Sequence, residues 1–542
     1  MSKFGKLLGF NATEKQTSVK TEIIAGIVTF LAMCYILTVN PNQIVWGGVV
    51  NVPNPDYGVI EGAAQFIPNF TPTTHPLWSS IFMATAFGAV IGTLLMAFLS
   101  RMPLAQASGM GLNSLVGGII GGGVGYVSYQ FNFTIGQAFM MVLISGIVFL
   151  LLSVIKIKGK TFRELIFDGM PVAVRSAISV GIGLFIAYIG FQNAGIIITN
   201  KYTQVDIVDF SNWGQQLIQW SGTTGFATKT ACVALIGFFL IAILDKFKVK
   251  GSVIIGILGA TIVGIPFGVT DVSVIKGTAD GISWKFWENY KNFFSAGDGS
   301  VFGSFTTVFK DGFPAGSAFT VIMLIITMCM IDMFDTMGTI VGCCGGNRIL
   351  SDENNKPHNY GKIMISDAVA TCAGAMLGTS TVTTFVESGA GVSAGGRTGL
   401  TAFVVAWLFF LATFALPFFA MIPGAATASA LIYVGVLMMK HNIKSVDFSN
   451  AINAASAFLT IIIMVVSYSI TDGIGVGMVA FTIMSLVAYA IEWIVYACMK
   501  DKVTVNENGE SVPAEKPKFP VSIVAIVVTA LFLVYFFVPT VL

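Results

Sequence analysis

Fifteen apolar segments run along this sequence, most of them close to the about 20 residues that a helix needs to cross a bilayer. Composition agrees, because 55% of the 542 residues are hydrophobic, only 10% are charged and the mean hydropathy is +0.82. These values lie outside the range of soluble domains. The predicted segments are 21–40, 77–100, 104–120, 135–155, 171–190, 228–244, 252–268, 316–341, 362–377, 385–396, 398–416, 424–439, 451–470, 473–498 and 520–540. We predict an all-α, polytopic membrane protein of fourteen spans, whose last apolar segment either crosses the bilayer or lies on it.

Basic residues predict the orientation of the chain in the membrane. If the N-terminus is cytoplasmic and the segments alternate, most of the 29 Lys and Arg residues fall on the cytoplasmic side, as the positive-inside rule requires. The first 20 residues lack an apolar run long enough for a cleaved signal peptide. We expect a multi-pass protein of the plasma (inner) membrane with a cytoplasmic N-terminus.

Charge and cysteine usage argue against several other classes of protein. The net charge of +2 gives no field that would attract nucleic acid. The seven cysteines form no CxxC motif, so buried small hydrophobic residues are the better interpretation than metal ligands or disulfides. No Ser/His/Asp set, nucleotide-binding loop or zinc spacing is present. We therefore expect no cofactor, no metal and no enzymatic activity.

The two halves of the chain resemble each other in places. Seven of the fourteen predicted spans precede the long outer loop 269–315 and seven follow it, so the halves enter the membrane from opposite sides. The stretches "PVAVRSAISVG" and "PGAATASALIYVG" both run from proline through small residues to Val-Gly, and "AMCYILTVN" aligned on "TMCMIDMFD" pairs Asn40 with Asp335. These features predict a 7+7 inverted repeat.

The third and tenth segments, 104–120 and 385–396, cannot be ordinary lipid-facing helices. Pro103 immediately precedes the third, which is interrupted by glycines, and the tenth follows a β-branched run and begins rich in glycine. Unpaired backbone at membrane depth is tolerated only inside protein or beside a cavity. Interrupted segments at corresponding positions of two halves point to the binding site of a transporter.

Three acidic residues lie deep in predicted spans, namely Asp332, Asp335 and Glu387, with no deep Lys, Arg or His to pair them. A charge at the bilayer centre costs at least about 2.5–3.5 kcal/mol, so these carboxylates indicate a wet or protonatable cavity. Asp332 and Asp335 share one helix face, where Thr336 and Thr339 are expected to hydrogen-bond them. All three histidines fall in predicted loops, so a proton relay has to use carboxylates.

Four motifs carry a resemblance to a known family: "TEIIAGIVTFLAMCYILTVNP", "ASGMGLNSLV", "DMFDTMGTIVG" and "GTSTVTTFVESGAGVSAGGRTGLTA". Over about residues 21–500 the chain resembles the purine permeases of the nucleobase–cation symporter-2 (NCS2) superfamily, in its AzgA-like adenine/guanine/hypoxanthine branch. The resemblance implies secondary active import of purines by proton symport. It also implies a short strand and a half-helix at the third and tenth segments. The chain departs from the branch in its enlarged outer segments 41–76 and 269–315.

The resemblance further implies how the chain is divided. A core domain would combine spans 1–4 and 8–11, and a gate domain spans 5–7 and 12–14. The expected parts are a cytoplasmic tail 1–20, core 21–160, gate 161–268, external loop 269–315, core 316–416, gate 417–498 and a C-terminal tail 499–542 with one more apolar segment. The implied partners are a purine, the proton, the lipid bilayer and, optionally, a second copy in a homodimer.

The same resemblance implies the site residues. They are Glu387, Asp332, Asn113, Met110 and Val386 for substrate binding and Asp335 for the coupling proton. The chain lacks the Gln-Asn-x-Gly signature of the xanthine/urate branch and has Glu387-Ser388-Gly389 instead, which argues against urate or ascorbate.

The chemistry of these residues supports a purine substrate independently of the family resemblance. A carboxylate can accept two adjacent N–H bonds from a flat, neutral purine, while Phe385 or Phe334 either stacks on the ring or packs in the core. Transport of another nucleobase, xanthine or uracil, stays open as an alternative. A small-anion transporter of the same fold would need a basic residue at the tenth segment. An intramembrane aspartyl protease would need its two aspartates on different helices.

Overall fold

A computed structural model describes most of the chain and has a helix in every predicted apolar segment. The described residues are 8, 16–49, 76–120, 133–157, 160–161, 169–200, 204–211, 213, 227–249, 251–276, 282–294, 312–314, 316–344, 349–351, 357–467, 470–498, 503–505, 511–513 and 516–537. Within them, eight helices are long and apolar enough to cross a membrane. A helical, multi-pass membrane architecture is thereby confirmed, whereas the count of fourteen spans stays a prediction.

Helices carry nearly all the regular structure of the described residues. They are α2 (Val19–Met33), α3 (Ile36–Val49), α4 (Pro76–Leu95), α5 (Met110–Ile120), α6 (Ile135–Val154), α8 (Val172–Asn193), α9 (Ala227–Lys246), α10 (Ser252–Gly264), α11 (Phe286–Phe294), α13 (Ala318–Cys344), α14 (Tyr360–Leu377), α15 (Ser388–Ser393), α16 (Gly399–Ala412), α17 (Leu416–Ala420), α18 (Gly424–Asn442), α19 (Ala451–Val466), α20 (Ile470–Cys498) and α21 (Ile523–Phe537). The strands are β1 (Gln106–Ser108), β2 (Lys156–Ile157), β3 (Lys160–Thr161), β4 (Ile197–Asn200), β5 (Gln204–Ile207), β6 (Val382–Thr384), β7 (Val503–Val505) and β8 (Ser511–Pro513). These strands pair only two by two.

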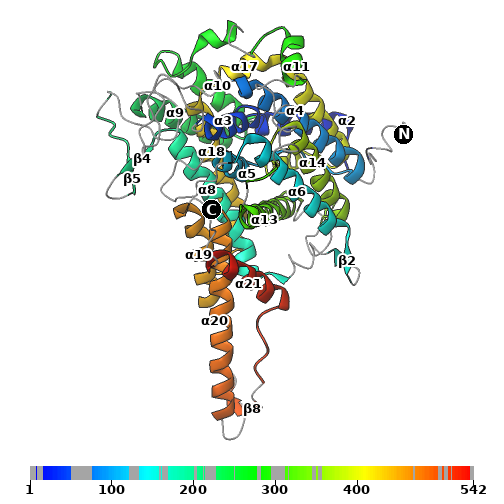
Figure 1. Cartoon of the computed structure of the whole chain (residues 1–542), viewed down its shortest axis with the longest axis vertical. Coiled ribbons are helices and arrows are strands. Elements are labelled where there is room, and N and C mark those ends of the chain that lie inside the picture. Colours follow the sequence, from blue (N-terminus) through cyan, green and yellow to red (C-terminus); the bar gives the residue numbers. More distant parts are fainter. Residues whose placement is uncertain are drawn as a thin grey trace. The chain divides into compact units, whose positions relative to one another are not determined.

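The chain divides into two compact units. Unit 1 consists of residues 1–155, 186–438 and 541–542, and unit 2 consists of 156–185 and 439–540. Within unit 2, α19 and α20 pack along each other (Figure 1). Unit 1 holds β1, β6 and all the deep carboxylates. The core and gate domains expected from the family resemblance stay a prediction.

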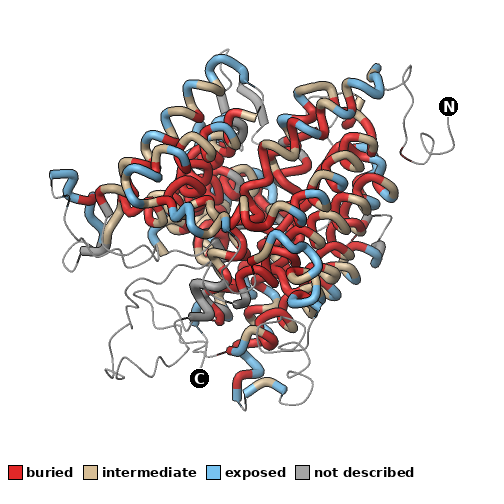
Figure 2. Tube along the Cα trace, turned by 90° about the horizontal axis from the view of Figure 1, so that it is seen from above, coloured by how far each residue is buried: buried red, intermediate tan, exposed pale blue. Residues whose placement is uncertain are grey.

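Individual helices are buried on one side and exposed on the other, as Figure 2 shows by the alternation of colours along the tube. On α16, Val405 and Phe409 are fully buried, whereas Trp407 and Leu411 are 56% and 45% exposed. Both sides of this helix are apolar. A helix that is apolar all round is typical of a membrane span, where the outward side faces lipid rather than water.

The third and tenth segments form a small antiparallel sheet inside unit 1. Strand β1 pairs with β6 in the register Gln106↔Thr384, Ala107↔Thr383 and Ser108↔Val382. The β-branched residues of β6 favour an extended backbone, and each strand is followed by a short helix, α5 or α15. The strand and half-helix predicted for each of these segments are therefore present in the structure.

Glycines let the neighbouring helices approach this sheet closely. A Cβ added at Gly374 of α14 would lie 2.5 Å from Val382 Cγ2, and one added at Gly92 of α4 would lie 2.8 Å from Gln106 Oε1. Side chains at these positions would push α4 and α14 away from the strands. Both glycines are thus needed for the tight packing that surrounds β1 and β6.

A buried carboxylate joins the first helix to α16. Glu22 of α2 is fully buried and accepts hydrogen bonds from Arg397 N at 3.0 Å, Thr398 N at 3.3 Å and Thr401 Oγ1 at 2.6 Å. Arg397 in turn donates through Nη1 to Val392 O of α15 at 2.6 Å. An anion at the start of a helix and a cation at the end of another both complement the helix dipoles, so this contact fixes α15 and α16 against α2.

The packing at Gly399 allows a direct test of this arrangement. A Cβ at Gly399, in the first turn of α16, would lie 2.1 Å from the backbone oxygen of Ala97. We expect Gly399→Ala to destabilise the protein by about 1–3 kcal/mol, the usual cost of overpacking. The measurement is the melting temperature of the purified protein in detergent. Gly361→Ala, in the first turn of α14 with nothing within 4 Å, is the matched control. Equal melting temperatures for the two variants would contradict the packing.

Candidate functional site

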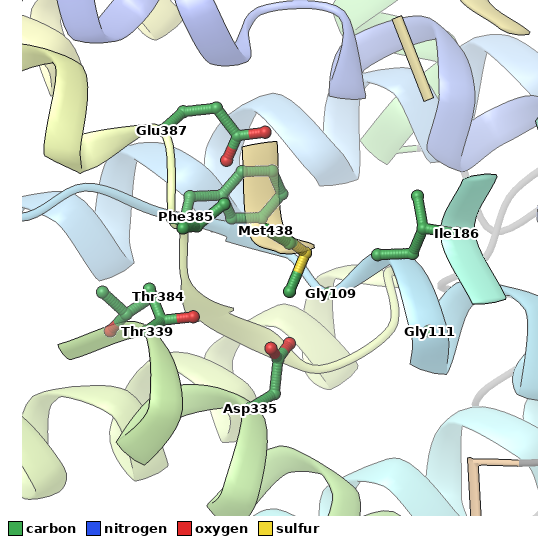
Figure 3. A pocket seen from close by; sticks show the side chains of 10 residues that line it. Gly109, Gly111, Ile186, Asp335, Thr339, Thr384, Phe385, Glu387 and Met438 are labelled. Atoms are coloured by element: carbon green, nitrogen blue, oxygen red, sulfur yellow. The ribbon is translucent and has the colours of Figure 1, made fainter. Parts of the chain in front are cut away.

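A small pocket lies in unit 1 where the two strands give way to their half-helices. It is lined by Gly109, Gly111, Ile186, Asp335, Thr339, Thr384, Phe385, Val386, Glu387 and Met438. The two glycines offer bare backbone at the start of α5, and 384–387 form the end of β6 and the turn into α15. Figure 3 shows the carboxylates of Glu387 and Asp335 on opposite sides of the pocket. No member of this lining is Lys, Arg or His.

Glu387 stands at the N-cap of α15 and is only 6% exposed. Its Oε1 accepts a hydrogen bond of 2.6 Å from the hydroxyl of Tyr35, a residue in the break between α2 and α3. None of the described residues donates a hydrogen bond to the other oxygen, Oε2. Leaving a buried acceptor unsatisfied is costly. Glu387 therefore brings one open acceptor to the pocket.

Asp335 and Thr339 reach the pocket from α13. They are four residues apart and so lie on one face of that helix. Asp335 is partly exposed, in contrast to the buried Asp332 one turn earlier. The pocket thus holds two carboxylates from separate elements with no cation in its lining.

Asp332 lies outside the pocket lining, although the family resemblance implied that it contacts substrate. It is 1% exposed, and its Oδ2 accepts a hydrogen bond of 3.0 Å from Thr371 Oγ1 of α14. Thr336, the partner expected for Asp332, donates instead to Asp367 Oδ2 at 2.7 Å. Asp332 and Thr336 thus both face α14, which carries Thr371 and Asp367.

Asp367 is a deep carboxylate that the sequence pattern does not mark. The predicted segment 362–377 places it near a membrane boundary, but α14 begins at Tyr360 and buries it completely. Its oxygens accept from Gln106 Nε2 at 2.9 Å and from Thr336 Oγ1 at 2.7 Å. Asp367 therefore links β1, α13 and α14 behind the pocket.

The other residues expected at the substrate site either line the pocket or support the elements around it. Val386 and Phe385 line the pocket, whereas Asn113 is fully buried on α5 and accepts a hydrogen bond from Ser380 Oγ ahead of β6. Asn113 thus joins the third segment to the tenth. The side chains of Met110 and Phe334 lie outside the described part of the structure.

Ile186 of α8 and Met438 of α18 complete the apolar side of the pocket. Both are buried, at 3% and 5% exposure. Nothing in the sequence pattern marks either one, because each is an ordinary apolar residue in an apolar span. Only the tertiary structure brings them to Glu387.

One solved structure shows the fold. The transmembrane domain of a cyanobacterium bicarbonate transporter, BicA, superposes with a TM-score of 0.53 over 86% of this chain and 99% of that chain. The two sequences are 14% identical. The likeness is thus one of fold alone.

Sequence relatives show the family. The family model described as "Permease family" matches residues 65–476. Adenine permease AdeQ of Escherichia coli (strain K12) is 32% identical over 477 residues, 88% of this chain and 90% of AdeQ. Guanine/hypoxanthine permease PbuG of Bacillus subtilis (strain 168) is 32% identical over 478 residues, 88% of this chain and 92% of PbuG. The chain therefore belongs to this permease family, within the nucleobase–cation symporter-2 superfamily.

Proposed function

We propose that this chain is a secondary active transporter that imports the purine nucleobases adenine, guanine and hypoxanthine across the plasma membrane by proton symport. The observation that carries the proposal is the open acceptor Glu387 Oε2 in a pocket between two half-helices. Relatives named as adenine and guanine/hypoxanthine permeases support the purine class.

The pocket has the groups that a neutral heterocycle needs. A purine presents N–H donors along its edge, and a carboxylate is a strong acceptor for them. Backbone at Gly111 can meet the polar edge without a side chain in the way, whereas the N–H of Gly109 already donates to Thr381 O. Phe385 and Met438 offer apolar surface to the ring. Met438 is unbranched and can adapt its shape as the base enters.

Other substrates are less well supported. A small anion would face Glu387 and Asp335 with no cation in the lining to balance it. Xanthine and uracil present similar N–H edges, so they remain the alternative within the same chemistry. Competition between nucleobases separates these cases.

The proposal includes fourteen spans in a 7+7 inverted repeat, divided into core and gate domains, with the N-terminus in the cytoplasm. The order helix, helix, strand, half-helix occurs as α3, α4, β1, α5 and again as α13, α14, β6, α15, which supports the repeat. In transporters with inverted repeats, the substrate site commonly lies where the two repeats meet.

Within the pocket we assign different roles to the two carboxylates. Glu387 accepts from the base, whereas Asp335 takes up the coupling proton. Protonation of Asp335 removes the repulsion between two negative charges in one pocket. Symport requires that the carrier with bound purine and the empty carrier differ in their affinity for this proton. Asp332, which contacts Thr371, supports α13 in this account.

Uptake by cells that express the protein tests the substrate class. We expect labelled adenine, guanine and hypoxanthine to accumulate and to compete with one another, because all present N–H donors to the same acceptor. Xanthine and uracil should compete weakly. Accumulation of uracil alone would contradict the purine assignment.

The binding role of Glu387 has a direct test. We expect Glu387→Ala to weaken guanine and hypoxanthine binding about 100-fold or more, since it removes a hydrogen bond to a charged group. Glu387→Gln should also be severe, because an amide replaces one acceptor with a donor. Binding of labelled base to purified protein is the measurement, and Glu288→Ala, at an exposed residue, is the control. Near-native affinity in Glu387→Ala, with the protein present in the membrane, would overturn the assignment.

Proton coupling is tested at Asp335. We expect Asp335→Asn to bind purine but to lose accumulation, because an amide cannot carry the coupling proton. Uptake by the variant should no longer respond to external pH or to a protonophore, whereas Asp271→Asn, in an exposed turn, should behave as wild type. If Asp335→Asn still concentrates purine with the wild-type pH dependence, the proton site lies elsewhere.

A further inference from the structure

The hydrogen bond between Tyr35 and Glu387 makes the two oxygens of the carboxylate unequal. Tyr35 is 1% exposed, belongs to the first predicted span and does not line the pocket. Its hydroxyl donates to Oε1 at 2.6 Å, across 352 positions of sequence. No described residue donates to Oε2. One oxygen is therefore engaged by the protein and the other is open.

A carboxylate that already accepts a hydrogen bond from the protein can accept fewer hydrogen bonds from a ligand than a free carboxylate. A free carboxylate accepts from two adjacent N–H groups at once, which is the recognition expected from the sequence. A hydrogen bond from Tyr35 fixes the rotation of the carboxylate and occupies a lone pair of Oε1. Oε1 keeps one lone pair, whereas Oε2 has both of its lone pairs available to a ligand and is the better acceptor of the two.

We propose that Tyr35 is a positioning residue that orients Glu387 so that the purine meets only Oε2, an inference that rests on the proposed function. Guanine presents two adjacent donors, N1–H and its 2-amino group, whereas hypoxanthine presents only N1–H on that edge. Oε2 then accepts the N1–H that both bases share. Tyr35 thus keeps Glu387 from selecting guanine over hypoxanthine.

Removing the hydroxyl of Tyr35 should change this selection. In Tyr35→Phe, the carboxylate can rotate and both lone pairs of Oε1 become available, so guanine can use both of its donors while hypoxanthine gains nothing. We expect the ratio of the two dissociation constants to move about tenfold in favour of guanine, the value of one additional charge-assisted hydrogen bond. A merely structural role of Tyr35 would weaken both bases alike and leave the ratio unchanged.

The amide variant of Glu387 gives a second consequence. A tyrosine hydroxyl donates to oxygen, so in Glu387→Gln it should hold the amide oxygen and turn the NH2 group toward the pocket. That NH2 faces the N1–H of hypoxanthine, donor against donor. In the double variant Tyr35→Phe/Glu387→Gln the amide can turn its oxygen to the base. We expect Tyr35→Phe to restore part of the binding that Glu387→Gln removes.

The experiment measures the binding of labelled guanine, hypoxanthine and adenine to purified wild type, Tyr35→Phe, Glu387→Gln and the double variant. Tyr433→Phe is the matched control, because Tyr433 is a buried tyrosine of α18 that hydrogen-bonds Asp245 and does not line the pocket. The proposal predicts a shifted guanine/hypoxanthine ratio in Tyr35→Phe alone among the tyrosine variants. It also predicts hypoxanthine binding at least tenfold tighter in the double variant than in Glu387→Gln.

The outcomes separate this inference from the proposed function. If the wild type binds no purine, both are overturned. If the wild type binds both oxopurines, but Tyr35→Phe leaves their ratio unchanged and gives no rescue, the role of Tyr35 alone is overturned. Should Tyr35→Phe not fold, Glu387→Gln decides by itself. Its fixed NH2 group should favour adenine, which offers the ring acceptor N1, over hypoxanthine, and an equal loss of both bases would contradict the proposal.

Discussion

The pairing of β1 with β6 is the constraint on which the rest of the site depends. Backbone at membrane depth must be hydrogen-bonded, and an isolated extended segment cannot do this for itself. The third and tenth segments hydrogen-bond each other's backbone by pairing in the register Gln106↔Thr384 to Ser108↔Val382. The pairing brings the starts of α5 and α15 together, so bare backbone and the N-cap residue Glu387 face one pocket.

Buried polar side chains hold this arrangement in place. Asp367 accepts from Gln106 and Thr336, and Asn113 accepts from Ser380, so these contacts join the third segment to the second half of the chain and join α13 to α14. A buried polar group that loses its partner costs about 1–3 kcal/mol. The network therefore favours one position of the strands against α13 and α14. That rigidity is what allows the open oxygen of Glu387 to be held at a defined place.

The sequence predicts the elements better than it predicts their contacts. Apolar length, glycine and β-branched residues mark the helices and the two interrupted segments, and unpaired acidic residues in apolar runs mark Glu387 and Asp335. Tyr35, Asp367 and Met438 carry no such signal, because an isolated tyrosine, an acid near a predicted boundary and a methionine in a span are each ordinary. Their roles depend on tertiary neighbours, which no local pattern contains. The same holds for the hydrogen bond that Tyr35 donates to Oε1 of Glu387.

A structure determined with bound hypoxanthine tests the central claim most directly. We predict that the base lies at the junction of β1 and β6, with a ring N–H within hydrogen-bonding distance of Glu387 Oε2 and with the hydroxyl of Tyr35 still on Oε1. Phe385 and Met438 should contact the ring. A base bound away from this junction, or bound here without contact to Glu387, would contradict the account.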